Sequence, residues 1–321
     1  MSTINRRNLL LLDNEFERNS KINTYLKNFI QVSVIFILGI TMLIPFYWMI
    51  VTSLSAPGSL DLQLIPDPVM WENYPKAWMA VNFGRGYINS MLVTMCVTFG
   101  QVFTSSMAAY AFARLNFPGR DKVFLAYLAT MMIPKDVTMI PNFILLKYIP
   151  EGLNMLFSPE NLFWTQDLFL FGKYYMGKPI GYDSYFALIM PGLFSAYGTF
   201  MLRQFFMTIP TDLEDAAKID GCSYFGIYWR VILPLSKPAL ATLTTFTFMG
   251  SWKEFMWPLV ITSSLDMKTL PILLQYFQGL YFTEWNLLMA GSVIMVIPAL
   301  IMFLFAQRYF VEGIQLGAIK G

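Results

Sequence analysis

Residues 286–307 read NLLMAGSVIMVIPALIMFLFAQ, an apolar stretch without a charged side chain. A helix needs about 20 such residues to cross a hydrocarbon layer roughly 30 Å thick. This stretch therefore predicts a transmembrane helix, kinked at Pro298. Five further apolar stretches meet the same requirement, at residues 29–54, 87–113, 123–146, 185–207 and 238–262. The sequence thus predicts an all-α, polytopic membrane protein with six transmembrane helices.

The composition of the 321 residues agrees with a membrane location and excludes several chemistries. Hydrophobic residues make up 56% and charged residues 13%, a larger apolar share than soluble domains have. Because there is no histidine, catalytic triads and histidine-ligated zinc are excluded. Cys96 and Cys222, the two cysteines, predict neither a disulfide framework nor a metal site. The net charge of +2 provides no broad basic surface for nucleic acid.

The distribution of lysine and arginine predicts the orientation. Most of these residues lie in the N-terminal segment, in the connections after the second and fourth spans, and in the C-terminal tail. Since such residues accumulate on the cytoplasmic side, both termini are predicted to be cytoplasmic. The expected organisation is a cytoplasmic segment 1–28, a six-helix domain 29–310 and a cytoplasmic tail 311–321. The first span is expected to remain as an anchor, because its apolar run exceeds that of a cleavable signal peptide.

The connection between the third and fourth spans, residues 148–184, is long and rich in aromatic residues. It is predicted to lie on the outward side of the membrane. Aromatic side chains concentrate at membrane interfaces, so an interfacial helix or a packed cap is expected here. A contact surface for a partner protein is the alternative.

Two short helices are predicted in the connection between the fourth and fifth spans, residues 208–237. Thr211 and Glu214 have capping-box spacing, and acidic residues crowd the first turn, where the helix dipole favours them. Gly221 can adopt the left-handed conformation that ends a helix. A second helix is expected to begin near Ser223, and Pro234 is expected to prevent its continuation. The helix pattern alone equally describes a surface hairpin lying on the bilayer.

The run from Asp215 to Pro234 has the form Asp-Ala-Ala-x3-Gly-x9-Val-x-Leu-Pro. It resembles the EAA loop of ABC importer permeases, which docks into a cleft on a cytoplasmic ATPase subunit. Asp215 stands where the family usually has glutamate, and Val231 stands where it usually has isoleucine. The resemblance implies that the ATPase-docking residues are Glu214, Asp215, Ala216, Ala217, Asp220, Gly221, Tyr224, Leu233 and Pro234.

The resemblance covers roughly residues 29–321 and is to the permease subunits of carbohydrate ABC importers of the maltose type, the MalG-like partner. The outward connection is longer here than is usual in that family. Segments that look like family signatures are PFYWM at 45–49, AAYAFARL at 108–115, MMIP at 131–134, LRQFF at 202–206 and QRYFV at 307–311.

The resemblance implies a non-catalytic subunit of an assembly in the bacterial cytoplasmic (inner) membrane. Its expected partners are a second homologous permease subunit, two ATPase subunits and an extracytoplasmic solute-binding protein. ATP and Mg are expected in the ATPase partners, because this chain has no Walker A sequence and is expected to bind no cofactor. Closure of the ATPases would move the docked loop and rock the spans between inward-facing and outward-facing states. The tail residues Gly317, Lys320 and Gly321 would lie at the ATPase interface.

Two charged pairs interrupt the third and fifth spans. A charge at bilayer depth costs about 2.5–3.5 kcal/mol, so such residues face a polar cavity or one another. One interpretation is that these residues form salt bridges between the two spans or extend their charged groups to the membrane edge. Contact with substrate is the other, because two cations suit a carboxylate and neighbouring tryptophans can stack on sugar rings. The substrate-pathway candidates are Lys135, Asp136, Trp252, Lys253, Glu254 and Trp257.

An acidic, uronate-containing oligosaccharide is therefore the favoured substrate. A neutral oligosaccharide is the alternative, since Asp136 and Glu254 can cancel both cations. The alternative function is an ion-coupled secondary transporter, because proton relays use intramembrane lysine, aspartate and glutamate. The docking loop favours the importer. An intramembrane enzyme has no support, since the sequence contains no Glu-x-x-His or Gly-x-Ser-x-Gly arrangement.

Overall fold

The long apolar stretches form helices in the computed structural model, which describes residues 6–58, 64–157, 164–170, 174–279 and 283–318. Three segments are long and apolar enough to cross a membrane: Tyr25–Ser53, Asn73–Arg114 and Trp285–Tyr309. They lie in α1 (Arg6–Ser53), in α2 (Asn73–Met79) with η1 (Ala80–Asn82) and α3 (Phe83–Arg114), and in α14 (Trp285–Ala318).

Three more candidate spans are bent. A bend of 97° separates α4 (Arg120–Ala129) and η2 (Thr130–Met132) from α5 (Lys135–Phe157). A bend of 41° separates α6 (Tyr185–Ile189) and η3 (Met190–Gly192) from α7 (Ala196–Met207). The third bend, of 81°, precedes α11 (Lys237–Trp252) and follows α9 (Tyr224–Ile227), η4 (Tyr228–Ile232) and α10 (Leu233–Leu235). Counting each bent pair as one span, the described residues contain up to six spans.

Three predicted spans differ from a single helix: residues 185–207 by the 41° bend between η3 and α7, and two others by larger interruptions. Residues 123–146 turn sharply because Ile133 is extended (φ −84°, ψ 116°), as expected for a residue that precedes a proline. Residues 238–262 are broken after Trp252, and the chain resumes as α12 (Met256–Ile261). The 16 residues of α11 rise about 24 Å, which is less than the roughly 30 Å of a hydrocarbon layer. The second charged pair therefore lies where the helix ends.

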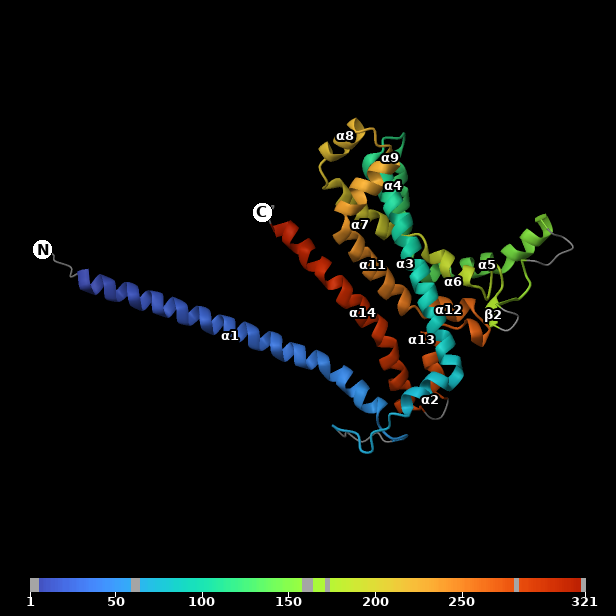
Figure 1. Ribbon diagram of the computed structural model, residues 1–321, viewed down its shortest axis with the longest axis horizontal. Helices are drawn as coiled ribbons and strands as arrows, with labels where there is room; N and C mark the ends of the chain where they lie inside the picture. The colour runs from blue at the N-terminus through green and yellow to red at the C-terminus, as the bar shows by residue number, and fades with distance from the viewer. Residues whose placement is uncertain (1–5, 59–63, 158–163, 171–173, 280–282, 319–321) are drawn as a thin grey trace.

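The helices pack around α3, which contacts both α7 and α11. Close approach of α7 requires Gly198, because a Cβ at this position would lie 2.8 Å from the Ser105 Oγ and 3.1 Å from Leu243. The helix α14 packs against α11 and α2. In Figure 1, α1 leaves this bundle near α2 and projects away from the other helices.

The described part of the outward connection begins with the last residues of α5 and continues, after residue 163, as a small β-hairpin. Strands β1 (Leu168–Leu170) and β2 (Tyr174–Gly177) pair antiparallel, with Phe169 opposite Tyr175. The hairpin contacts η5 (Leu265–Met267), which is followed by α13 (Leu270–Leu274) and η6 (Gln275–Phe277). The loop that contains α8 (Asp212–Ile219) and α9 lies at one end of the bundle, away from the hairpin (Figure 1).

Candidate docking site

The loop between α7 and α11 carries the predicted docking residues and lies at one end of the bundle (Figure 1). Its first helix is α8 (Asp212–Ile219). Gly221 ends this helix in the left-handed conformation, with φ +81°. The Gly221 amide donates to the Lys218 carbonyl and the Cys222 amide to the Ala217 carbonyl, both at 2.9 Å. This pair of bonds is a Schellman motif, so the predicted role of Gly221 as a helix stop is confirmed.

The two predicted N-caps of this loop have different outcomes. Ser223 caps α9, because its Oγ accepts a hydrogen bond from the Gly226 amide at 3.2 Å. Thr211 has helical backbone angles and makes no capping hydrogen bond, so the predicted capping box is wrong. The physical reason is that the Glu214 carboxylate has a buried cationic partner elsewhere, which attracts it more strongly than a backbone amide does.

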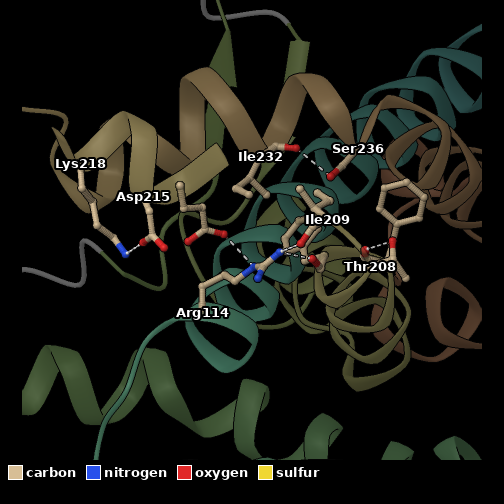
Figure 2. Close-up of polar contacts among 10 residues, drawn as sticks. Arg114, Thr208, Ile209, Asp215, Lys218, Ile232 and Ser236 are labelled. Carbon is tan, nitrogen blue, oxygen red and sulfur yellow. Dashed lines mark hydrogen bonds and ion pairs between the residues drawn. The ribbon is translucent and has the colours of Figure 1, made fainter. Parts of the chain in front are cut away.

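The sequence predicted that the second helix ends before Pro234, but the helix does not end there. It continues through the π-helix η4 into α10, and the chain turns only near Ser236. A π-turn is wider than an α-turn, so it displaces the preceding carbonyls that a proline ring would otherwise meet. Ser236 is fully buried, and its Oγ donates to the Ile232 carbonyl at 2.7 Å (Figure 2).

The predicted docking residues divide between two faces of the loop. Glu214 and Ala217 are only 6% and 9% exposed and face the chain's own core, and Leu233 is half-buried. Consecutive helical residues point about 100° apart, so the neighbours of Glu214 face outward. The exposed residues, which are available to a partner, are Asp215, Ala216, Asp220, Gly221, Tyr224 and Pro234.

Glu214 forms a buried ion pair with Arg114, the last residue of α3. The Arg114 Nε lies 2.8 Å from the Glu214 Oε1, and the two side chains are 7% and 8% exposed. Burial raises the pKa of the Glu214 carboxyl above its usual range, whereas the nearby Arg114 and Lys218 cations lower it. Sequence reasoning did not find this partner, although Arg114 lies within one of the family-like segments. Its position at the end of an apolar span, beside the loop, was the available signal.

Arg114 also binds the end of α7. Its Nη2 donates to the carbonyls of Phe206 and Ile209 at 2.6 and 2.5 Å. Figure 2 shows Arg114 reaching from α3 to Ile209, while Asp215 and Lys218 lie on the other side of α8. The Lys218 Nζ is 2.9 Å from the Asp215 Oδ1, and this second pair is exposed.

The four charged substrate-pathway candidates are exposed side chains: Lys135, Asp136, Lys253 and Glu254. Among the ion pairs of the described residues, none joins the two spans through these groups. Lys135 and Asp136 begin α5, whereas Lys253 and Glu254 lie in the break between α11 and α12. The Glu254 Oε1 accepts a hydrogen bond from the Trp257 amide at 3.4 Å, at the start of α12.

Both candidate tryptophans use their indole N–H groups inside the chain. Trp252 is 3% exposed, and its Nε1 donates to the Met295 carbonyl at 2.9 Å. Trp257 is half-buried, and its Nε1 donates to the Ala187 carbonyl at 2.9 Å. Of the tail candidates, Gly317 lies near the end of α14, whereas Lys320 and Gly321 lie outside the described residues.

The fold places the chain in a known class. It is similar to a chain in the crystal structure of a bacterial ABC transporter involved in the import of the acidic polysaccharide alginate. The TM-score is 0.71 at 20% sequence identity, covering 89% of this chain and 96% of that chain. The protein is thus an all-α, polytopic membrane protein with the fold of an ABC importer permease.

The sequence comparison then defines the family. Residues 101–315 match the family described as "binding-protein-dependent transport system inner membrane component", and the chain belongs to this family. The arabinooligosaccharides transport system permease protein AraQ of Bacillus subtilis (strain 168) is 31% identical over 290 residues, 88% of this chain and 92% of that protein. The sn-glycerol-3-phosphate transport system permease protein UgpE of Yersinia enterocolitica is 33% identical over 263 residues, 79% of this chain and 83% of that protein.

Family membership confirms the main sequence-based assignment. The chain is a multi-pass inner-membrane permease subunit of a binding-protein-dependent ABC importer, and it is not a catalytic subunit. Permease subunits of this kind bind no cofactor, and nucleotide is bound by ATPase partners.

Proposed function

We propose that the chain is the translocation subunit of an ATP-driven importer of oligosaccharides, and that acidic, uronate-containing oligosaccharides are its favoured substrates. Transport occurs by alternating access in a complex with a second homologous permease subunit, two ATPase subunits and an extracytoplasmic solute-binding protein. Both termini and the loop 208–237 lie in the cytoplasm.

The exposed face of the α8–α9 loop carries the ATPase-docking part of this proposal. Asp215, Ala216 and Asp220 point away from the chain's own core. Tyr224 and Ile219 add exposed apolar surface, at 62% and 87% exposure. Apolar side chains of this size beside carboxylates suit burial in a cleft on a partner protein.

The proposed permease partner is supported by the exposure of α1. Large apolar side chains on several sides of this helix are exposed, among them Phe29, Val34 and Ile35 at 70%, 50% and 69%. Its contacts with the rest of the chain are mainly with α14. A second permease subunit that packs against α1, together with lipid, would cover this surface.

The substrate assignment rests on Lys135 and Lys253. Both are exposed, and neither has an ion-pair partner among the described residues. A lysine at membrane depth favours an anionic group, and a carboxylated sugar provides one. The relative AraQ, named for arabinooligosaccharide transport, supports the oligosaccharide class. Because Asp136 and Glu254 can cancel the charges of the two lysines, neutral sugars are tested in parallel.

Uptake by the reconstituted complex tests the proposal. Lys253→Met keeps a long unbranched side chain and removes the charge. Loss of one charge-assisted contact, about 1.5–3 kcal/mol, should lower uptake of a labelled uronate oligosaccharide roughly tenfold or more, with little change for a neutral one. Lys122→Met, at an exposed lysine in the first turn of α4, is the matched control.

Three outcomes would contradict parts of the proposal. Equal losses for acidic and neutral sugars would remove the acidic preference. If the complex fails to assemble in Lys253→Met but assembles in Lys122→Met, Lys253 has a structural role. Uptake that requires an ion gradient instead of ATP would favour the secondary transporter.

A further inference from the structure

The ion pair between Arg114 and Glu214 joins three elements that the sequence separates. Arg114 ends α3, Glu214 lies in the first turn of α8, and the Arg114 Nη2 holds the carbonyls of Phe206 and Ile209 at the end of α7. A guanidinium has five donors in a rigid plane and can therefore bind all three acceptors at once. Its charge also suits the C-terminal end of α7, where the carbonyls carry partial negative charge.

The second helix of the loop has its own attachment to α3. Tyr228 is 2% exposed, and its hydroxyl lies 2.7 Å from the Ser106 hydroxyl, which is also buried. Ser106 and Arg114 are both on α3, eight residues or about 12 Å apart along the helix. The loop is therefore bound to α3 by polar contacts at two separate positions along the helix.

The side chains of Glu214 and Asp215, the two neighbouring acidic residues of the motif, point in opposite directions. Asp215 is exposed and pairs only with Lys218 among the described ion pairs, whereas Glu214 is turned inward to Arg114. One carboxylate is thus available to a partner, and the other fixes the same helix turn to the membrane helices.

We propose that Arg114 and Glu214 are positioning residues that fasten α8 to α3 and α7, so that these elements move as one body when a docked ATPase displaces α8. This rests on the proposed docking of the loop. Apolar contacts resist separation but allow sliding, whereas displacing Glu214 from Arg114 would leave two unpaired charges in a buried site, so the ion pair keeps α8 in place beside α3 and α7. The pair thus determines how much of the displacement of α8 reaches the membrane helices.

A distance measurement in the assembled complex tests this inference. One spin label is attached to Cys96 on α3, and the other to a cysteine introduced at the exposed Asp212 of α8, with Cys222 replaced by serine. The complex with its ATPase subunits is measured without nucleotide and after trapping with MgATP and orthovanadate. In the otherwise unchanged chain, the label distance is expected to stay the same in both states.

Two variants separate positioning from folding. Glu214→Ala leaves Arg114 buried without its carboxylate, and the label distance is expected to shift on trapping. In the double variant Arg114→Met with Glu214→Met, apolar side chains replace a buried ion pair, an exchange that proteins tolerate well. It should retain the ATPase subunits, yet show the same shift and about a fivefold or greater loss of coupled uptake. Glu72→Gln, which alters the exposed ion pair with Lys76 at the start of α2, should behave like the parent.

The outcomes are distinguishable. A double variant with an unchanged label distance and full uptake would show that the pair only fills space, which overturns the inference. A distance that shifts in the parent complex would overturn it as well. If the parent complex does not retain ATPase subunits, the proposed docking function fails, independently of the ion pair.

Discussion

Gly221 sets the direction of the chain between the two helices of the docking loop. Its φ of +81° and the two hydrogen bonds of the Schellman motif turn the backbone away from the axis of α8. An added Cβ would meet no atom of this chain within 4 Å, so the requirement for glycine comes from the backbone conformation. The left-handed conformation costs residues with a Cβ about 1–2 kcal/mol, and asparagine tolerates it best.

A pair of substitutions tests this interpretation. Gly221→Val should lower the amount of ATPase subunit that co-purifies with the complex, because a β-branched residue strongly disfavours the left-handed conformation. Gly221→Asn should lower the amount of co-purifying ATPase subunit less than Gly221→Val does. The measurement is the ratio of ATPase to permease subunits after purification from membranes. Full retention in Gly221→Val would contradict the docking role of this loop.

Among the elements, the outward hairpin is attached by polar contacts. The Tyr175 hydroxyl donates to the Asp183 Oδ2 at 3.0 Å, and the Arg85 Nη2 donates to the Tyr175 carbonyl at 2.6 Å. Asp183 is 2% exposed, and its Oδ1 accepts from the amides of Ser263 and Ser264. These contacts connect β2 to the segment after α12 and to the start of α3. They favour a packed cap over a loosely attached interfacial segment.

Shortening the outward connection should therefore destabilise the complex. Deletion of residues 160–178 removes Tyr175 and leaves the buried Asp183 with one donor fewer, so a lower yield of assembled complex is expected. Tyr175→Phe, which removes one hydrogen bond worth about 0.5–1.5 kcal/mol, should reduce the yield less. Yield is measured by gel filtration. A full yield with lost stimulation by the solute-binding protein would instead favour a contact surface.

For the whole molecule, the arrangement of helices relates the termini to the docking loop. The helices α1 and α14 both have one end near α2, and α14 runs from there toward the end of the bundle that carries α8 (Figure 1). The end of α14 at Ala318 thus lies on the side of the loop. The excess of lysine and arginine in the same segments predicts that this side is cytoplasmic.

Reporter fusions test the orientation. A fluorescent protein that folds only in the cytoplasm should fluoresce when fused to either terminus, and alkaline phosphatase, which needs an oxidising compartment, should be inactive there. A phosphatase inserted between residues 165 and 166, in the outward connection, should be active. Phosphatase activity at either terminus would reverse the predicted topology.

The length of the apolar stretches, the Gly221 helix stop and the Ser223 cap could all be predicted from sequence. Each depends on properties of neighbouring residues: the hydrophobicity needed to cross a bilayer, a φ preference, or a hydroxyl three residues before an amide. The loop motif led to the family through its resemblance to the EAA loop, and the comparisons confirm that family. In these cases the physical cause acts over a few residues or one span.

The tertiary structure decided which side of each helix is buried and which distant groups meet. Glu214 had capping-box spacing but binds Arg114, because the packing of α8 on α3 and α7 brings a cation within 2.8 Å in a water-poor site. Trp252, a candidate for sugar stacking, instead packs against Tyr87 with ring centroids 5.7 Å apart. Local sequence determines where helices form and end, whereas burial and ion pairing depend on which surfaces the folded chain brings together.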